Sequence, residues 1–358
     1  LKYQWTQSTT APAESTFSTT FTSGKAITKN TGTGSNWYLW ILAKDNAGNK
    51  TIKRSNAFYL DNTAPTASVS PTAPVAKNKV TITLKDAHSK VKYWAVTTST
   101  TAPTTTSTTI TTNTSTLNTW YPVTAATQVS TTFTPGTTSK YYVWVKDSVG
   151  NGATAYAATF TPTAANYEIS KSGTTTYYET ILANATANAV TGSTIKVLNS
   201  VTESTAATIE EGKSLTINTN QKTITMNNCN IKNNGSLIVK GQGTIKCSTG
   251  KSEGSVIVST GDLNIGLVTI VNTVGEGIYA GGTMNMSAGT VTGKTAGIEV
   301  TGTTTITGGP VSATGSNEGA IEPGGLGGKA TININGGTIT GDYGVCQGGQ
   351  RVETAQVI

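Results

Sequence analysis

A short apolar pattern recurs through the second half of the chain and constrains its fold more than any other feature. Within three residues after a glycine come an apolar residue, one free position and usually a second apolar residue. Subtracting the residue numbers of successive first members gives steps of 19 to 24 residues. Apolar residues two apart indicate a strand with one buried face, and a repeat of this length indicates stacked units. The first members are Ile195, Leu215, Leu237, Val256, Ile278, Ile298, Ile321 and Val345.

Further short strands between these positions indicate which type of repeat architecture the chain forms. Apolar and threonine residues alternate at 222–226, 289–293 and 331–335, and glycine or asparagine stands at the corners. Several short strands in each turn predict a right-handed parallel β-helix of about eight coils, each roughly 4.8 Å above the last. A leucine-rich horseshoe needs helical segments that the repeat lacks.

The N-terminal half contains one module twice. Residues 8–12 recur unchanged at 99–103, and both copies contain an aromatic strand, a Lys-Asp-x-x-Gly-Asn turn and then a final strand, at 57–60 and 155–160. Short alternating strands separated by turns predict a β-sandwich of about 100 residues. Trp40 and Trp144 take equivalent places in the two copies and are expected inside the sandwich.

The first copy lacks a segment that the second copy has. Residues 66–90, with a strand at 79–84, precede the first aromatic strand of the second copy only. We therefore expect the first module to expose an unpaired edge and half a core. Two explanations stay open: a longer chain, or strands donated by another chain in a filament. The candidate donor is the tail with Val352, Ala355 and Val357.

Two resemblances to bacterial surface proteins follow from these motifs. Residues 43–49 (Ala-Lys-Asp-Asn-Ala-Gly-Asn) and 61–66 (Asp-Asn-Thr-Ala-Pro-Thr) resemble motifs of the Ig-like modules that occur in tandem on large surface proteins. An apolar helical face at 178–185, placed before the first coil, resembles the entrance of pectin-lyase-like β-helices. The chain is thus expected to be all-β. It would have an incomplete Ig-like module at 1–64, a second at 65–165, and a β-helix at 166–358 with a cap helix around 177–186.

Composition and charge argue against several classes of function. The net charge of +7 is spread without any lysine or arginine run, so nucleic-acid binding is not expected. No apolar run is long enough to enter a membrane. Cys229, Cys247 and Cys346 have the spacing of neither a disulfide framework nor a metal site, and buried or half-buried thiols are expected.

No cofactor is predicted. The carboxylates of Asp45 and Asp147 offer calcium-type oxygen ligands, but at these positions a side chain that fixes its own turn is the favoured interpretation.

One patch on the predicted β-helix carries candidate site residues. The residue that follows the first apolar residue of each repeat is expected to point outward. At these positions Glu299 and Glu322 would be neighbours on adjoining coils, with Tyr279 one coil earlier. Two carboxylates one sheet spacing apart can raise each other's pKa or share a cation. These residues are weak catalytic candidates and a candidate binding patch. The full outward set is Lys196, Thr216, Ile238, Ile257, Tyr279, Glu299, Glu322 and Cys346.

The function predicted from these features is structural or adhesive. The resemblances imply an extracellular protein of the bacterial cell surface, with an Ig-like stalk that presents the β-helix to glycans, host surfaces or sister subunits. The alternatives are a self-associating filament subunit and a polysaccharide lyase or hydrolase using Glu299 and Glu322. An enzyme is the less favoured interpretation, because no arginine or aspartate cluster accompanies the glutamates.

Overall fold

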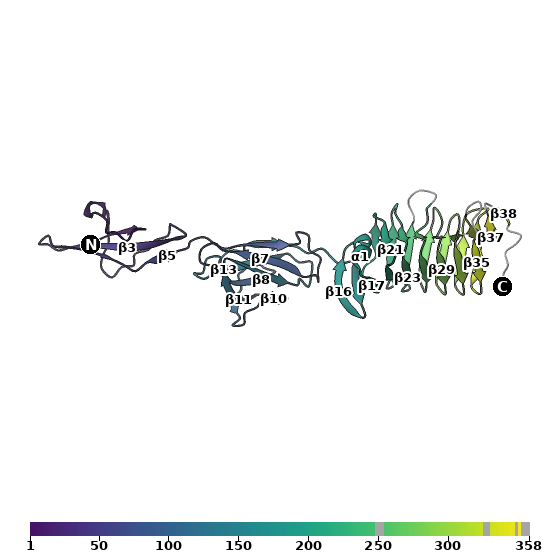
Figure 1. Cartoon of the computed structure of the whole chain (residues 1–358), viewed down its shortest axis with the longest axis horizontal. Helices are drawn as coiled ribbons and strands as arrows, with labels where there is room; N and C mark the ends of the chain where they lie inside the picture. Colours follow the sequence, from purple (N-terminus) through teal and green to yellow (C-terminus); the bar gives the residue numbers. More distant parts are fainter. Residues whose placement is uncertain (248–253, 325–329, 348–349, 352–358) are drawn as a thin grey trace. The chain divides into compact units, whose positions relative to one another are not determined.

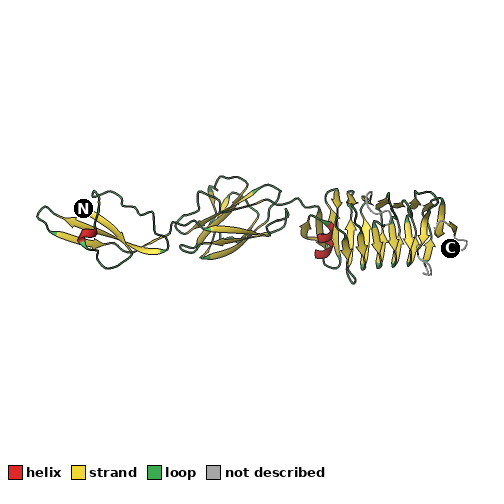
Figure 2. Cartoon of the chain, turned by 90° about the horizontal axis from the view of Figure 1, so that it is seen from above, coloured by secondary structure: helices red, strands yellow, loops and turns green. Residues whose placement is uncertain are grey.

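In the residues that the structure describes, the chain folds into β-sheets, one short α-helix and one turn of 3-10 helix (Glu14–Thr16). The computed structural model describes residues 1–247, 254–324, 330–347 and 350–351. Residues 1–74 and 79–162 form one compact unit, and residues 75–78 and the chain from 163 onward form the other. The predicted all-β class, with N-terminal sheets followed by a solenoid, is confirmed (Figures 1 and 2). No helix in the described ranges has the length and apolarity to cross a bilayer.

The first 60 residues form a single antiparallel sheet. Its strands are β1 (Lys2–Thr6), β2 (Thr19–Thr20), β3 (Ser35–Lys44), β4 (Lys50–Arg54) and β5 (Phe58–Leu60), in the order β2-β1-β3-β4 with β5 beside β3. One face carries a small core of Phe17, Trp40 and Leu42. The other face includes Trp5 and Leu39, which are only half-buried. Within the described chain, no second sheet of its own faces this one, as the missing segment predicted.

Residues 66–160 form two sheets that enclose a core. One sheet has the order β10-β12-β7-β6 and the other β14-β13-β8-β11-β9. Alternate residues of β7 and β13, such as Ile82 and Val143, meet between the sheets and are fully buried. The strands are β6 (Thr66–Ser70), β7 (Val80–Lys85), β8 (Val91–Thr97), β9 (Thr105–Thr106), β10 (Asn113–Thr114), β11 (Thr119–Ala126), β12 (Gln128–Phe133), β13 (Tyr141–Asp147) and β14 (Ala158–Phe160).

The two equivalent tryptophans are buried, but the second lies outside the core between the sheets. Trp144 packs against Ala95 and Trp120, because it points to the opposite face of β13 from Val143. The internal repeat extends to single hydrogen bonds. Trp40 Nε1 donates to Thr6 Oγ1 at 3.0 Å, and Trp144 Nε1 donates to Thr97 Oγ1 at 2.9 Å.

Thr97→Val should destabilise the N-terminal unit by about 1–2 kcal/mol, because it leaves the buried indole N–H of Trp144 without an acceptor. Urea unfolding followed by tryptophan fluorescence measures this loss. The matched variant Thr6→Val should lower the free energy of unfolding by less, since Thr6 is only half-buried. Equal losses in the two variants would contradict this explanation.

The second unit is a solenoid of three parallel sheets. Each coil contributes one strand to each sheet, and strands of successive coils pair in parallel register. Among the described residues, seven strands of each sheet pair in parallel, which agrees with the roughly eight coils predicted. Inward side chains from all three sheets form one continuous apolar core.

Solenoid sheet 1 contains β17 (Ser193–Val197), β20 (Ser214–Asn218), β23 (Ser236–Lys240), β26 (Asp262–Ile265), β29 (Thr283–Met286), β32 (Thr303–Ile306) and β35 (Thr331–Ile334). Solenoid sheet 2 contains β18 (Val201–Glu203), β21 (Thr223–Met226), β24 (Thr244–Cys247), β27 (Thr269–Asn272), β30 (Thr290–Gly293), β33 (Pro310–Ala313) and β36 (Thr338–Thr340). Solenoid sheet 3 contains β19 (Ala207–Ile209), β22 (Ile231–Asn233), β25 (Ile257–Ser259), β28 (Ile278–Ala280), β31 (Ile298–Val300), β34 (Gly319–Pro323) and β37 (Tyr343–Gln347), followed by β38 (Gln350–Arg351).

A hairpin and a helix precede the first coil. The strands β15 (Tyr167–Lys171) and β16 (Thr174–Glu179) pair with each other, and β15 continues into solenoid sheet 1. The helix α1 (Leu182–Asn188) lies at the start of the solenoid (Figure 2). Its Leu182 and Ala185 are buried in the solenoid core. The short helix is confirmed, but its predicted start near residue 177 was wrong. Residues 174–179 are rich in threonine and tyrosine, which favour a strand.

The predicted set of first members mixes two sheets. Leu215 and Leu237 pair in solenoid sheet 1, whereas Ile278 and Ile298 pair in solenoid sheet 3. In solenoid sheet 1, Leu237 is followed by Leu263, not by a residue near 256. All three sheets carry the same apolar alternation, so spacing alone does not tell them apart.

The remaining predictions have separate outcomes. The expectation of buried or half-buried thiols is confirmed, because Cys247 and Cys346 are buried and Cys229 is half-buried. The candidate donor residues Val352, Ala355 and Val357 lie outside the described residues. The boundaries at 64/65 and 165/166 stay predictions.

Candidate functional sites

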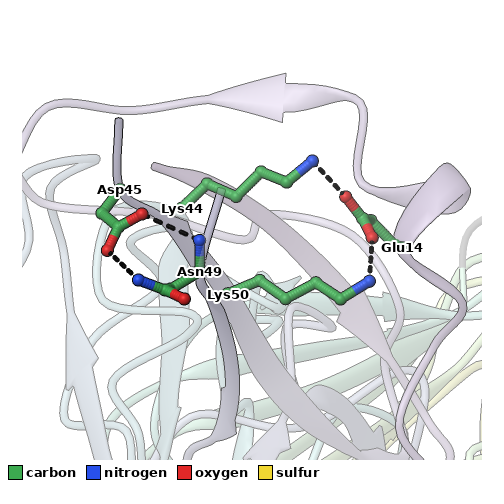
Figure 3. Close-up of polar contacts among 5 residues, drawn as sticks. All are labelled: Glu14, Lys44, Asp45, Asn49 and Lys50. Atoms are coloured by element: carbon green, nitrogen blue, oxygen red, sulfur yellow. Dashed lines mark hydrogen bonds and ion pairs between the residues drawn. The ribbon is translucent and has the colours of Figure 1, made fainter. Parts of the chain in front are cut away.

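The two Lys-Asp-x-x-Gly-Asn turns are closed by their aspartates, as predicted. Asp45 accepts hydrogen bonds from the backbone and side-chain nitrogens of Asn49, both at 2.8 Å (Figure 3). These bonds hold the pKa of Asp45 below its ordinary value. Glu14 is paired with Lys44 and Lys50 nearby, at 2.7 and 2.6 Å, and these ammonium groups lower its pKa to about 2.

Asp147 closes the second turn in the same way but has different surroundings. Its Oδ1 accepts from the backbone of Asn151 at 2.9 Å, and its Oδ2 accepts from the Asn151 side chain at 2.7 Å. Asp45 is exposed, whereas Asp147 is only 2% exposed. Asp147 lies beside Asp61 and Asp86, which are 7% and 4% exposed, and ligand oxygens of the three lie within 4.8 Å of one another.

Each carboxylate in this cluster comes from the end of a strand and is held by backbone donors. Asp61 follows β5 and accepts from the backbone nitrogens of Thr63 and Ser89 at 2.9 and 3.0 Å. Asp86 follows β7 and accepts from those of His88 and Lys90 at 3.0 and 2.8 Å. The bonds orient the carboxylates without supplying positive charge, because every donor is an uncharged backbone or side-chain amide.

No cationic side chain pairs with this cluster among the described residues, where the ion pairs are those of Glu14. Buried carboxylates at this separation repel one another, and leaving them unpaired is costly. An oxygen-only donor set suits a hard divalent cation such as Ca²⁺. The Oγ of Ser89, enclosed and without a hydrogen-bond partner in the described chain, is a further oxygen beside Asp61. Asp61, Asp86 and Asp147 are the residues that could hold a metal.

The second candidate site is the outward face of solenoid sheet 3. Tyr279 pairs with Glu299, and Glu299 pairs with Glu322, so these three residues are neighbours on successive coils. The other residues of the predicted outward set do not continue this row: Lys196, Thr216 and Ile238 point outward as predicted, but from another sheet, and Cys346 is buried. That sheet is solenoid sheet 1, and Ile257, wrongly predicted to point outward, is also buried. The true outward residues before Tyr279 are Val258 and Lys232.

An open cavity of about 530 Å³ lies at this face. Glu276, Tyr279 and Glu299 contribute to its wall. The Tyr279 hydroxyl lies 2.9 Å from Thr301 Oγ1, a hydrogen bond that fixes the ring, and Ser255 Oγ donates to Glu276 Oε2 at 3.3 Å. The other lining residues are Asn230, Gly254, Ser255 and Val258.

Half-burial and neighbouring charge raise the pKa of both stacked glutamates. For Glu299 the causes are burial, then Glu276, then Glu322. For Glu322 burial is again the largest cause, and a contact with Cys346 Sγ partly offsets it. A carboxyl of raised pKa near a second carboxylate is able to act as a general acid, and the pair is also able to share a cation.

The stability of the solenoid should fall as pH rises from about 4.5 toward neutrality. The pKa of Glu299 and Glu322 is higher in the folded state, so this state binds more protons between the unfolded and folded pKa values. The stabilisation is complete below the unfolded pKa and is lost above the folded one. Denaturant midpoints across this pH range measure the effect. The double variant Glu299→Gln, Glu322→Gln should flatten the profile and be more stable than the wild type at neutral pH.

Sequence reasoning also missed a buried carboxyl in the solenoid. Glu203, 2% exposed, ends β18 and points inward. Its Oε1 accepts from the Tyr167 hydroxyl at 2.6 Å and from the Leu182 backbone nitrogen at 3.2 Å. Burial raises the pKa of Glu203, partly offset by these two donors. The residue ties the entrance hairpin and α1 to the first coil, which is a structural role.

Comparisons with known proteins found no match to any family model, curated protein or solved structure.

Proposed function

We propose that this protein is an extracellular structural and adhesive component of a bacterial surface, in which the N-terminal modules carry the solenoid. The observation that carries the proposal is the outward face of solenoid sheet 3. Its short strands stack in register and place Tyr279, Glu299 and Glu322 side by side above a largely apolar core. A rigid, regularly spaced face of this kind suits contact with a repetitive polymer such as a glycan.

The N-terminal half supports a spacer role for that region. Its two modules repeat the same tryptophan–threonine hydrogen bond and the same aspartate-closed turn, although only one of them has two sheets. Such duplication is typical of Ig-like stalks, and identifying these modules as Ig-like is part of the proposal. A cation at Asp61, Asp86 and Asp147 would fasten the end of the first sheet to the loops of the second module.

A glycan array probed with the labelled full chain tests the adhesive function. Binding to a defined set of glycans is the expected result. Uniform absence of binding, to the array and to bacterial wall polymers, would overturn the adhesive part and leave only a structural role.

The second candidate function is hydrolysis or elimination on a polysaccharide. The observation that favours it is the pair Glu299 and Glu322, stacked on adjoining coils with raised pKa values. Incubation of the chain with array-positive polysaccharides separates the two functions. If new reducing ends or unsaturated products form with the wild type and not with Glu299→Gln, the protein is an enzyme. If the polymer stays intact, the adhesive function is favoured.

A filament subunit is the third candidate. It is favoured by the face of the first sheet that carries Trp5 and Leu39, which no second sheet of its own covers in the described chain. Strand donation from a neighbouring copy would cover such a face. Electron microscopy of concentrated full-length protein, with and without residues 352–358, tests for ordered polymers that need this tail.

A further inference from the structure

The cavity on solenoid sheet 3 combines negative charge, an aromatic ring and neutral polar groups. Glu276 and Glu299 both line it, and Glu322 stands on the next coil. Among the described residues no lysine, arginine or histidine nitrogen lies within ion-pair distance of these glutamates. A site with this charge inside a chain of net charge +7 attracts a cationic group more strongly than a neutral one.

The uncharged part of the lining favours a ligand that is more than a bare cation. The Tyr279 ring is held by its hydrogen bond to Thr301 and offers an aromatic face, which attracts ammonium groups as well as apolar ligand surface. Asn230 and Ser255 add amide and hydroxyl groups that can exchange hydrogen bonds with hydroxyls. The volume of about 530 Å³ lies within the range of small-ligand sites.

We propose that this cavity binds a glycan carrying a free amino group, with the ammonium between Glu276 and Glu299 and a sugar ring against Tyr279. The proposal rests on the adhesive function above and names the class of glycan. A neutral sugar would satisfy the hydrogen-bonding groups but leave the carboxylates repelling each other. A metal ion alone would leave the aromatic wall unused.

Calorimetric titration of the full chain with a β-1,4-linked glucosamine tetramer tests this assignment, with the fully N-acetylated tetramer as the matched probe. The amine form should bind at least about tenfold more tightly, because acetylation removes the charge. Glu299→Gln and Glu276→Gln, which preserve side-chain size, should each weaken binding of the amine form by a similar factor. Glu211→Gln, at an exposed turn of the solenoid, is the control and should leave the affinity unchanged.

Each other outcome overturns a defined part of the account. If both tetramers bind with equal affinity and Tyr279→Ala loses this binding, the cavity is still a glycan site but does not select the amine. Equal affinity for the glucosamine tetramer and oligolysine would reject a glycan-specific site. No binding of the amine form would reject the assignment, and the glycan array then decides whether adhesion itself survives. Circular dichroism of each variant confirms that a loss of binding is not a loss of fold.

Discussion

Calcium is expected to stabilise the N-terminal unit by about 2.7 kcal/mol when its concentration is a hundredfold above Kd. The reason is the cluster of Asp61, Asp86 and Asp147, whose buried carboxylates have no cationic partner among the described residues. For a unit of this size the gain corresponds to a rise in melting temperature of roughly 5–10 °C. Scanning calorimetry of the full chain, in excess calcium and in chelator, measures it, and the solenoid transition provides an internal reference.

Two variants decide whether the effect belongs to this cluster. Asp86→Asn keeps an oxygen for the backbone donors of His88 and Lys90 but removes one charge, so the calcium response should largely disappear. Asp45→Asn changes the equivalent of Asp147 in the first module, and should leave the response intact because Asp45 belongs to no such cluster among the described residues. An unchanged response in Asp86→Asn would mean that calcium acts elsewhere.

Glu203→Ala should destabilise the solenoid by about 3 kcal/mol. The substitution opens a cavity and removes the acceptor of two buried donors, the Tyr167 hydroxyl and the Leu182 N–H. Because these donors belong to β15 and α1, the hairpin and helix at the entrance should loosen first. Denaturant unfolding gives the total loss, and hydrogen exchange of residues 167–188 locates it.

The glutamine variant separates hydrogen bonding from charge. Glu203→Gln keeps an acceptor oxygen in place, and the burial that raises the pKa of Glu203 also penalises its negative charge, which the amide lacks. Its stability should therefore stay within about 1 kcal/mol of the wild type. A loss as large as that of Glu203→Ala would show that the ionised carboxylate is required.

The architecture was predictable because the solenoid depends on a periodic signal. Inward residues such as Ile217 and Val239 alternate with outward ones in every coil, and glycine corners separate the strands. The assignment of strands to sheets was not predictable, because the three sheets share this alternation and coil lengths vary. A step of 19 residues from Leu237 to Val256 therefore looked regular, although it passes from one sheet to another.

One candidate site was predictable from the local sequence pattern, and the other was not. Glu299 and Glu322 were predicted as neighbours because both follow the same local pattern, and the pairing of their strands agrees. The cluster of Asp61, Asp86 and Asp147 was missed, since it joins three strand ends that are far apart in sequence. One signal was available: each aspartate ends or directly follows an apolar strand in a chain with few acidic residues.

Glycan arrays of two matched triple variants test the central claim, that solenoid sheet 3 is the contact surface. The first variant replaces Tyr279, Glu299 and Glu322 by serine, and the second replaces the outward residues Asn264, Asn285 and Thr305 of solenoid sheet 1 by serine. The account predicts that the second variant binds the same glycans as the wild type and that the first binds none. Binding retained by the first variant, or lost by the second alone, would contradict it.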